Sequence, residues 1–305
     1  MNYNKTIFIG TLLSVVFTTV KAQQTPVYSE YAHNSILLNP AHAGYNRGTD
    51  IALANRSFVS DLEGLPATSS LTVNSSTGNS HIGFGITALS DQIGVTSSTG
   101  LTASLSYKLI FDHHYKRAQW WDYNPNTLTF GISAGAVWYK EDLLSLEIQN
   151  DVAFSENINA TLPTVGVGVL YNRNQFYVGL SNTNLIGGVV KRRNLELDSP
   201  TYAYGGYRLY TNRFQKVQIK PNFLLKYITD APYQLDLNVA VNIKNIVEFG
   251  AGYRTNSSMN ILAILHQLNG FKMLFSYNFP IDNSNVVGST LGVLLRYRVE
   301  SNRRR

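Results

Sequence analysis

The 305-residue chain contains no cysteine and few charged residues, and after residue 20 it has no run of 18 apolar residues. Without cysteine, no disulfide can stabilise the fold and no lipid can be attached to a thiol. The missing apolar run argues against a helical membrane span in the mature chain. Charged residues make up only 14% of the chain, against roughly 25% in an average soluble domain. We therefore expect stability to come from a closed, extensive sheet that exposes little charge.

The N-terminus has the features of a secretory signal peptide. Residues 1–22 combine a positive charge at Lys5, an apolar stretch over residues 7–17 and the small-residue cleavage site Val20-Lys21-Ala22. We exclude this segment from the fold and expect an exported protein. The net charge is +6, and we interpret the basic tail 301–305 as solvated. Export disfavours nucleic acid as a partner.

One stretch, residues 233–242, alternates strictly between apolar and polar side chains. Successive side chains of a strand point to opposite faces, so this stretch has one apolar and one polar wall. A soluble sandwich would bury the apolar wall. A membrane barrel would instead turn it to lipid and turn the polar wall to a lumen. The apolar positions are Tyr233, Leu235, Leu237, Val239 and Val241, between Gln234, Asp236, Asn238, Ala240 and Asn242.

Similar β-rich segments, about 9 to 14 residues long, recur between turn residues from residue 49 onward. This length suits a tilted strand crossing the apolar part of a membrane, and an even strand number is typical of bacterial outer-membrane barrels. We therefore predict an all-β outer-membrane barrel of about 14 antiparallel strands, forming one domain over residues 49–300. The segments are 49–58, 67–75, 79–90, 97–111, 127–140, 161–172, 175–183, 201–213, 217–228, 233–243, 246–256, 258–267, 270–279 and 288–299.

The connections between these segments differ in length on the two sides of the predicted barrel. With the N-terminus in the periplasm, every connection on that side except 112–126 is tight, as expected for periplasmic turns. The exception contains Arg117, Trp120, Trp121 and Tyr123. Clustered Trp and Arg are enriched at binding hot spots, but Trp also anchors proteins at lipid headgroups. This loop is either a partner-binding surface or an interfacial anchor.

The polar wall of the predicted barrel is unevenly charged. Its acids are Asp236 and Glu248, and we expect Asp236 to pair with Lys220 or Lys226 on the preceding strand. An excess of positive charge in a lumen would favour an anionic segment, a solute or a lipopolysaccharide core. The predicted basic face consists of Lys108, Lys220, Lys226, Arg254, Lys272, Arg296 and Arg298.

Glycines at spacings of two or four fall on the same polar wall, for example Gly83 with Gly85 and Gly131 with Gly135. They would permit either sheet curvature or the close approach of something filling the lumen, and we favour curvature. No motif for chemistry accompanies them. The six histidines lack metal-ligand spacing, and the chain has no nucleophile elbow and no phosphate-binding glycine loop. We expect no cofactor, no metal and no enzymatic activity.

Several distinctive motifs are spread along the chain. They are Gln23 to Asn34, Leu38-Asn39-Pro40-Ala41-His42-Ala43-Gly44, Glu63 to Thr68, Ser90-Asp91-Gln92-Ile93-Gly94-Val95-Thr96, Phe176 to Ser181, Lys220 to Tyr227 and Gln234 to Asn238. Together they resemble the PorP/SprF family of type IX secretion and gliding proteins of the Bacteroidetes, and the resemblance covers essentially the whole mature chain. The chain departs from the family pattern at Ser57-Phe58-Val59-Ser60 and at Val287-Gly288-Ser289-Thr290. We expect these departures to bear on partner choice rather than on the barrel.

The resemblance implies a non-enzymatic outer-membrane barrel of the type IX system. Its expected partners are periplasmic ring lipoproteins, the C-terminal domain of a large cell-surface adhesin, or both, with lipopolysaccharide around it. Within the N-terminal segment 23–48, residues 26–44 carry too many apolar and aromatic side chains for a free tail, and we expect them to enter the lumen or cap the periplasmic mouth. The alternatives are a passive or fatty-acid-type uptake channel and an outer-membrane hydrolase.

Overall fold

The computed structural model describes residues 31–46, 48–60, 64–77, 81–111, 126–148, 151, 154–173, 175–190, 195–211, 217–255, 258–266, 270–281 and 288–299. The predicted signal peptide and the basic tail lie outside these ranges, as do residues 26–30. No helix in the described part of the chain is long and apolar enough to cross a membrane.

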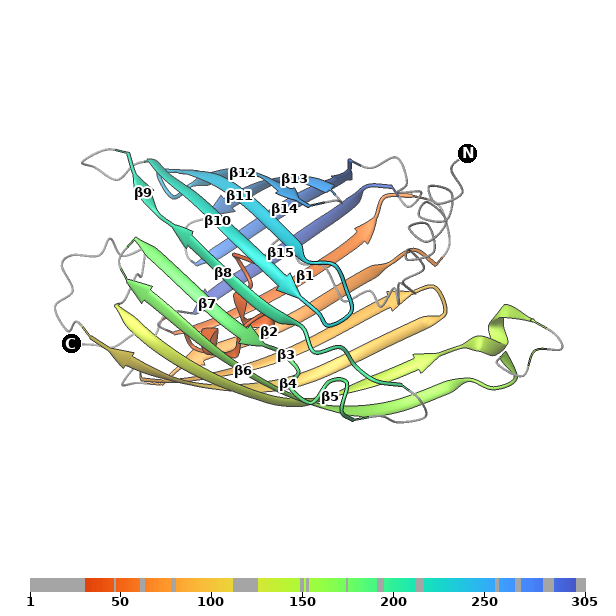
Figure 1. Ribbon diagram of the computed structural model, residues 1–305. Coiled ribbons are helices and arrows are strands. Elements are labelled where there is room, and N and C mark those ends of the chain that lie inside the picture. The colour runs from red at the N-terminus through yellow and green to blue at the C-terminus, as the bar shows by residue number, and fades with distance from the viewer. Residues whose placement is uncertain are drawn as a thin grey trace, which may run out of the picture.

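A single antiparallel sheet contains all the strands in the order of the chain (Figure 1). It closes because β1 pairs with β15 along its whole length and β10 pairs with β11. The bounds are β1 Thr49–Phe58, β2 Ala67–Ser76, β3 Ile82–Ile93, β4 Thr96–Ile110, β5 Thr127–Glu141, β6 Ile158–Arg173, β7 Phe176–Asn182, β8 Thr201–Tyr207, β9 Leu209–Tyr210, β10 Val217–Tyr227, β11 Gln234–Ile243, β12 Val247–Arg254, β13 Ser258–His266, β14 Phe271–Pro280 and β15 Thr290–Val299.

Fifteen labelled segments make fourteen barrel strands, because β8 and β9 are one strand interrupted at Arg208. Both pair with β10 in one continuous register, which places the interruption opposite Lys220 and Pro221. Proline has no backbone N–H and cannot donate to the ladder. On the other edge of the strand, the Arg208 N–H donates to the carbonyl of Gln175 at the β6–β7 turn (2.7 Å). The prediction of about fourteen antiparallel strands in a closed barrel is confirmed.

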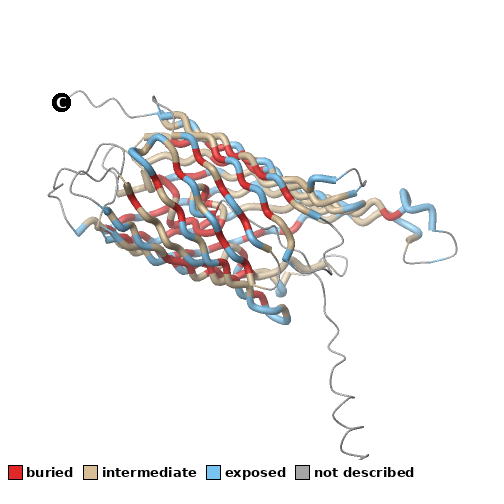
Figure 2. Tube along the Cα trace, turned by 90° about the horizontal axis from the view of Figure 1, so that it is seen from above, coloured by how far each residue is buried: buried red, intermediate tan, exposed pale blue. Residues whose placement is uncertain are grey.

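Side chains alternate along the strands between buried and exposed positions (Figure 2). In β11, Asp236 and Asn242 are buried while Leu237 and Val239 are about half exposed. The sheet is therefore inverted relative to a soluble protein, with polar side chains inside and apolar ones on the outer surface, as in a membrane barrel. The apolar wall of residues 233–242 faces outward.

We call the end of the barrel at which β1 begins with Thr49 and β15 ends with Val299 the base, and the other end the crown. Most base connections are short, such as 174–175 and 244–246, whereas the crown carries the longer connections 142–157 and 183–200. The β5–β6 hairpin projects beyond the rest of the crown and ends in a short 3-10 helix, η3 (Leu143–Leu146) (Figure 1). We predict that the crown faces the cell exterior.

Candidate functional site in the barrel lumen

Residues 31–46, which we call the lumenal segment, lie inside the ring of strands (Figure 1). They form two short 3-10 helices, η1 (Ser35–Leu37) and η2 (Pro40–His42). η1 packs on β3, and η2 packs on β4, β5 and β6. Leu38 and Ala41 are buried in one apolar cluster with Tyr202 and Tyr204 of β8. Closure of a mouth by the longer segment 26–44 stays a prediction.

The Asn39 side chain of the lumenal segment is fully buried. Its Oδ1 accepts the N–H of Ala41 (2.8 Å), which caps η2. Its Nδ2 donates to the Val169 carbonyl of β6 and to the Tyr204 hydroxyl, both at 3.0 Å. It also lies 3.5 Å from the Leu180 carbonyl of β7. One amide therefore joins the segment to three barrel strands.

Inward-facing glycines of the sheet leave room for the lumenal segment to pack closely against it. A Cβ on Gly131 would overlap the backbone of Ala41, and one on Gly168 would overlap the Asn39 amide. A Cβ on Gly83 would likewise overlap the Ala43 carbonyl. Our preference for curvature alone is therefore wrong for these positions, because they permit close approach of the segment. For Gly135, in contrast, the three atoms nearest to a Cβ belong to Leu101 and Thr102 of neighbouring β4.

The end of the lumenal segment is fixed to β4. Ser106 donates its hydroxyl to the Ala43 carbonyl (2.7 Å), and the buried Lys108 ammonium donates to the Gly44 carbonyl. Gly44 has a φ of +58°, and a Cβ there would lie 2.5 Å from the Ser75 carbonyl oxygen. The position accepts only glycine for both reasons. Lys108, predicted to belong to a basic lumenal face, thus contacts the segment.

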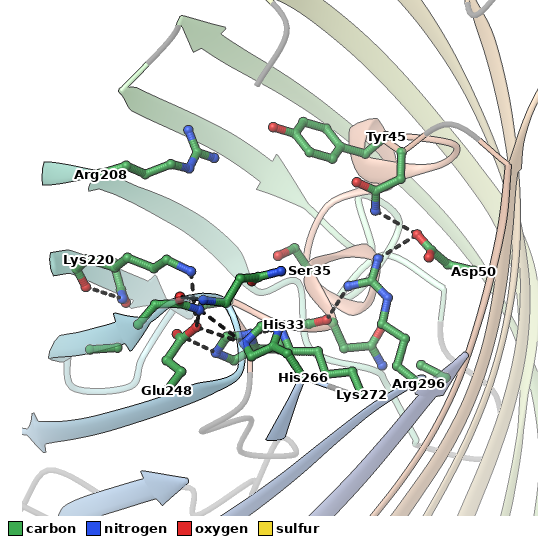
Figure 3. A pocket seen from close by; sticks show the side chains of 18 of the residues that line it. His33, Ser35, Tyr45, Asp50, Arg208, Lys220, Glu248, His266, Lys272 and Arg296 are labelled. Carbon is green, nitrogen blue, oxygen red and sulfur yellow. Dashed lines mark hydrogen bonds and ion pairs between the residues drawn. The ribbon is translucent and has the colours of Figure 1, made fainter. Parts of the chain in front are cut away.

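On the β10–β15 side, the lumenal segment leaves a cavity of about 870 Å³. The lining includes Lys244 of the β11–β12 turn and Phe271 at the start of β14, so the cavity reaches the base. Figure 3 shows charged side chains on facing walls, with Arg208 and Lys220 on one side and Asp50 and Arg296 on the other.

Glu248 of β12 organises the first of two charged clusters in this cavity (Figure 3). It is 1% exposed, and its Oε2 accepts from Lys220 of β10 at 3.0 Å and lies 3.2 Å from His266 of β13. Lys272 of β14 lies 3.1 Å from the His33 Nδ1 of the lumenal segment. Burial, together with the Lys272 ammonium, holds the pKa of the His33 imidazole well below its usual range. A neutral imidazole can accept this hydrogen bond.

Asp50 of β1 organises the second cluster and is 2% exposed. It accepts from Arg296 (2.5 Å) and Arg298 (2.7 Å), both on β15, and from Asn46 of the lumenal segment (2.6 Å). The prediction that only Asp236 and Glu248 supply negative charge to the polar wall is therefore wrong. The alternation of β1, which places Asp50 and Ala52 on the same buried face, predicts that Asp50 belongs to the polar wall.

The predicted pairing of Asp236 with Lys220 or Lys226 is also wrong. Arg254 of β12 binds Asp236 with two hydrogen bonds, Nε to Oδ1 at 2.8 Å and Nη2 to Oδ2 at 2.6 Å. The β11–β12 register sets the two residues directly opposite each other, whereas β10 offers Leu224 at that position. The planar guanidinium also suits a carboxylate better than an ammonium does.

At the crown, two of the predicted motifs meet. Gly94 forms the β3–β4 turn with a φ of +58°, and its N–H donates to the Gly64 carbonyl of the β1–β2 connection (2.8 Å). Asp91 accepts from Thr68 at 2.5 Å. The two departures from the family pattern are neighbours as well, because the Val59 N–H donates to the Ser289 carbonyl (2.9 Å).

The predicted partner-binding loop with Arg117, Trp120, Trp121 and Tyr123 lies outside the described residues. Of the predicted basic face, four side chains line the cavity. Two of the others, Lys226 and Arg254, lie near the crown ends of their strands. The prediction missed Arg208, whose guanidinium lies 4.9 Å from the centre of the Tyr177 ring. The four in the cavity are Lys220, Lys272, Arg296 and Arg298.

The sequence as a whole matches one family profile. The profile, "Type IX secretion system membrane protein PorP/SprF", aligns with residues 20–297. No curated protein matches the chain.

Among solved structures, similar barrels include the CymD monoaromatic hydrocarbon channel, with a TM-score of 0.51 and 12% sequence identity over 91% of this chain and 94% of that one. The toluene transporter TbuX of Ralstonia pickettii has a TM-score of 0.52 and 10% identity over 87% of this chain and 93% of that one. At such low identity the likeness establishes the barrel fold alone.

Proposed function

The chain belongs to the PorP/SprF family of type IX secretion system membrane proteins, and on that premise we propose that it is a structural outer-membrane component that exports or anchors a cell-surface protein. In this role the barrel holds the C-terminal domain of an adhesin, contacts the periplasmic ring lipoproteins, or does both. It carries out no chemistry of its own.

The lumenal segment is the observation that best supports this role over passive uptake. A channel needs a continuous path, whereas here Leu38, Asn39 and Ala41 are buried against strands on one side of the lumen. Charged and amide side chains are interspersed among the apolar residues that line the remaining cavity, and a hydrophobic solute would remove water from these polar groups without replacing their hydrogen bonds. The hydrocarbon channels share the barrel fold with this chain. That likeness does not assign their substrates to it.

Affinity purification from native outer membranes tests the proposal. The full-length protein, tagged at the C-terminus, is solubilised in mild detergent, and co-eluting proteins are identified by mass spectrometry against an untagged strain. We expect either a large surface adhesin or ring lipoproteins at near-stoichiometric amounts. Recovery of the barrel alone, combined with ohmic conductance in planar bilayers, would favour the uptake channel instead.

The loop with Trp120 and Trp121 is the proposed contact for a ring partner. Replacing both by alanine should abolish co-purification of ring lipoproteins while the barrel remains folded. Trp138, which is 48% exposed near the crown, supplies the matched control, and Trp138→Ala should leave co-purification unchanged. If both variants retain the partner, the two loop tryptophans serve as interfacial anchors.

A further inference from the structure

The cavity at the base has more positive than negative charge. Among the residues that the structure describes, six cationic side chains line it, against two carboxylates. Both carboxylates already accept hydrogen bonds from neighbouring cations, Asp50 from Arg296 and Arg298 and Glu248 from Lys220. The six cations are Arg208, Lys220, Lys244, Lys272, Arg296 and Arg298.

Half of these cations are arginines, whose guanidinium groups stay protonated in proteins. Arg208 donates to the Asn172 amide oxygen (3.3 Å), and its guanidinium lies over the Tyr177 ring. A recess with one predominant sign of charge and low-dielectric walls focuses the field and attracts a ligand of the opposite sign. The positive charge of the cavity therefore favours an anionic ligand.

The other lining groups indicate what carries the anionic charge. Eight asparagines line the same cavity, among them Asn222 of β10 and Asn238 of β11. Amide side chains both donate and accept hydrogen bonds, which matches the alternating N–H and C=O groups of a peptide backbone. The volume of about 870 Å³ lies at the upper end of the usual range for ligand pockets. A single inorganic ion would leave most of it empty.

We propose that this cavity binds an acidic polypeptide segment that enters from the base. The acidic side chains of the segment lie against the cations that line the cavity, and its peptide backbone lies against the asparagines. The inference rests on the cavity and does not require the proposed role in secretion, because any chain with an accessible acidic segment is a candidate ligand.

Fluorescence anisotropy with the full-length barrel in detergent tests the proposal, with fluorescein-labelled hexaglutamate as the probe and hexaglutamine as its neutral control. We expect saturable binding of hexaglutamate, much weaker binding of hexaglutamine, and loss of affinity as salt rises. Arg208→Gln and Lys244→Gln should each weaken binding at least about threefold, the size expected for one lost charge at partly screened range. Lys140→Gln, an exposed cation near the crown, is the matched control and should change nothing.

Four results would overturn the proposal. They are no binding of hexaglutamate, equal binding of hexaglutamine, an equal loss of affinity in Lys140→Gln, and displacement of the probe by glucosamine 6-phosphate at lower concentration than by unlabelled hexaglutamate. The last result would assign the cavity to a phosphorylated sugar. Arg208 packs on Tyr177, so its variant is checked for heat-modifiable migration in gels. Lys244 is exposed on a turn, so its variant keeps the test decisive if the Arg208 variant does not fold.

Discussion

Replacing Asn39 by alanine should release the lumenal segment while leaving the barrel intact. Two of the hydrogen bonds of this side chain join the segment to the barrel, to the Val169 carbonyl and to the Tyr204 hydroxyl, both at 3.0 Å. At about 1 kcal/mol each, their loss weakens docking of the segment by about 2 kcal/mol. Because the strands pair with one another and not through the segment, the substitution should weaken docking of the segment without lowering the stability of the barrel.

The absence of cysteine allows a clean assay. Ser106 is 1% exposed beneath the lumenal segment, so a reporter Ser106→Cys reacts with a water-soluble maleimide only when the segment moves away. A loss of about 2 kcal/mol should raise the labelling rate about 30-fold when opening is fast compared with labelling. Heat-modifiable migration in gels reports separately whether the barrel has folded.

The matched control is Asn55→Ala, which removes an exposed asparagine from β1 that donates to Ser69 (2.8 Å). Its labelling rate should stay within about twofold of the reporter alone, because its hydrogen bond lies outside the lumen. If Asn39→Ala labels no faster than this control, the segment is not held by Asn39 and the reasoning is wrong.

The remaining predictions concern glycine packing and two of the buried carboxylates of the lumen, Asp236 and Asp50. Gly131→Ala should displace the lumenal segment and raise the same labelling rate, whereas Gly100→Ala, whose Cβ would come no closer than 3.4 Å to a neighbour, should not. Asp236→Asn leaves the buried Arg254 guanidinium without its carboxylate and should cost about 3 kcal/mol of unfolding free energy in urea; a double variant that also removes the guanidinium should recover part of this loss. Asp50→Asn should tighten hexaglutamate binding in the anisotropy assay, because it removes one of two carboxylates that compete for the cavity cations.

Much of the architecture could be predicted because a barrel strand has a simple period. In β11, the alternation of Leu237 and Val239 with Asp236 and Asn242 defines the two faces before any partner strand is known. The same rule assigns Asp50 to the polar wall, and the prediction missed it only because β1 was not read in this way. Strand ends were less certain, since the strand predicted at 79–90 lies at Ile82–Ile93.

The lumenal site could not be predicted in detail, because side-chain pairing depends on register between strands. Asp236 faces Arg254 only through the β11–β12 register, which residue spacing within one strand does not reveal. The role of the glycines could not be predicted either, because it also depends on which residues lie next to them in the folded protein. Gly131 and Gly168 look alike in the sequence whether they permit curvature or close contact, and the position of Ala41 and Asn39 beside them decides between the two.

The sequence by itself determined an exported, cysteine-free chain whose alternating strands turn apolar side chains outward, because a period of two residues is a local property of the backbone. The tertiary structure alone decided which inward groups meet: the Asn39 amide against β6, β7 and β8, Glu248 beneath His33, and the cations gathered around a cavity at the base. These contacts join residues that are distant in the chain, and closure of the sheet between β1 and β15 brings them together.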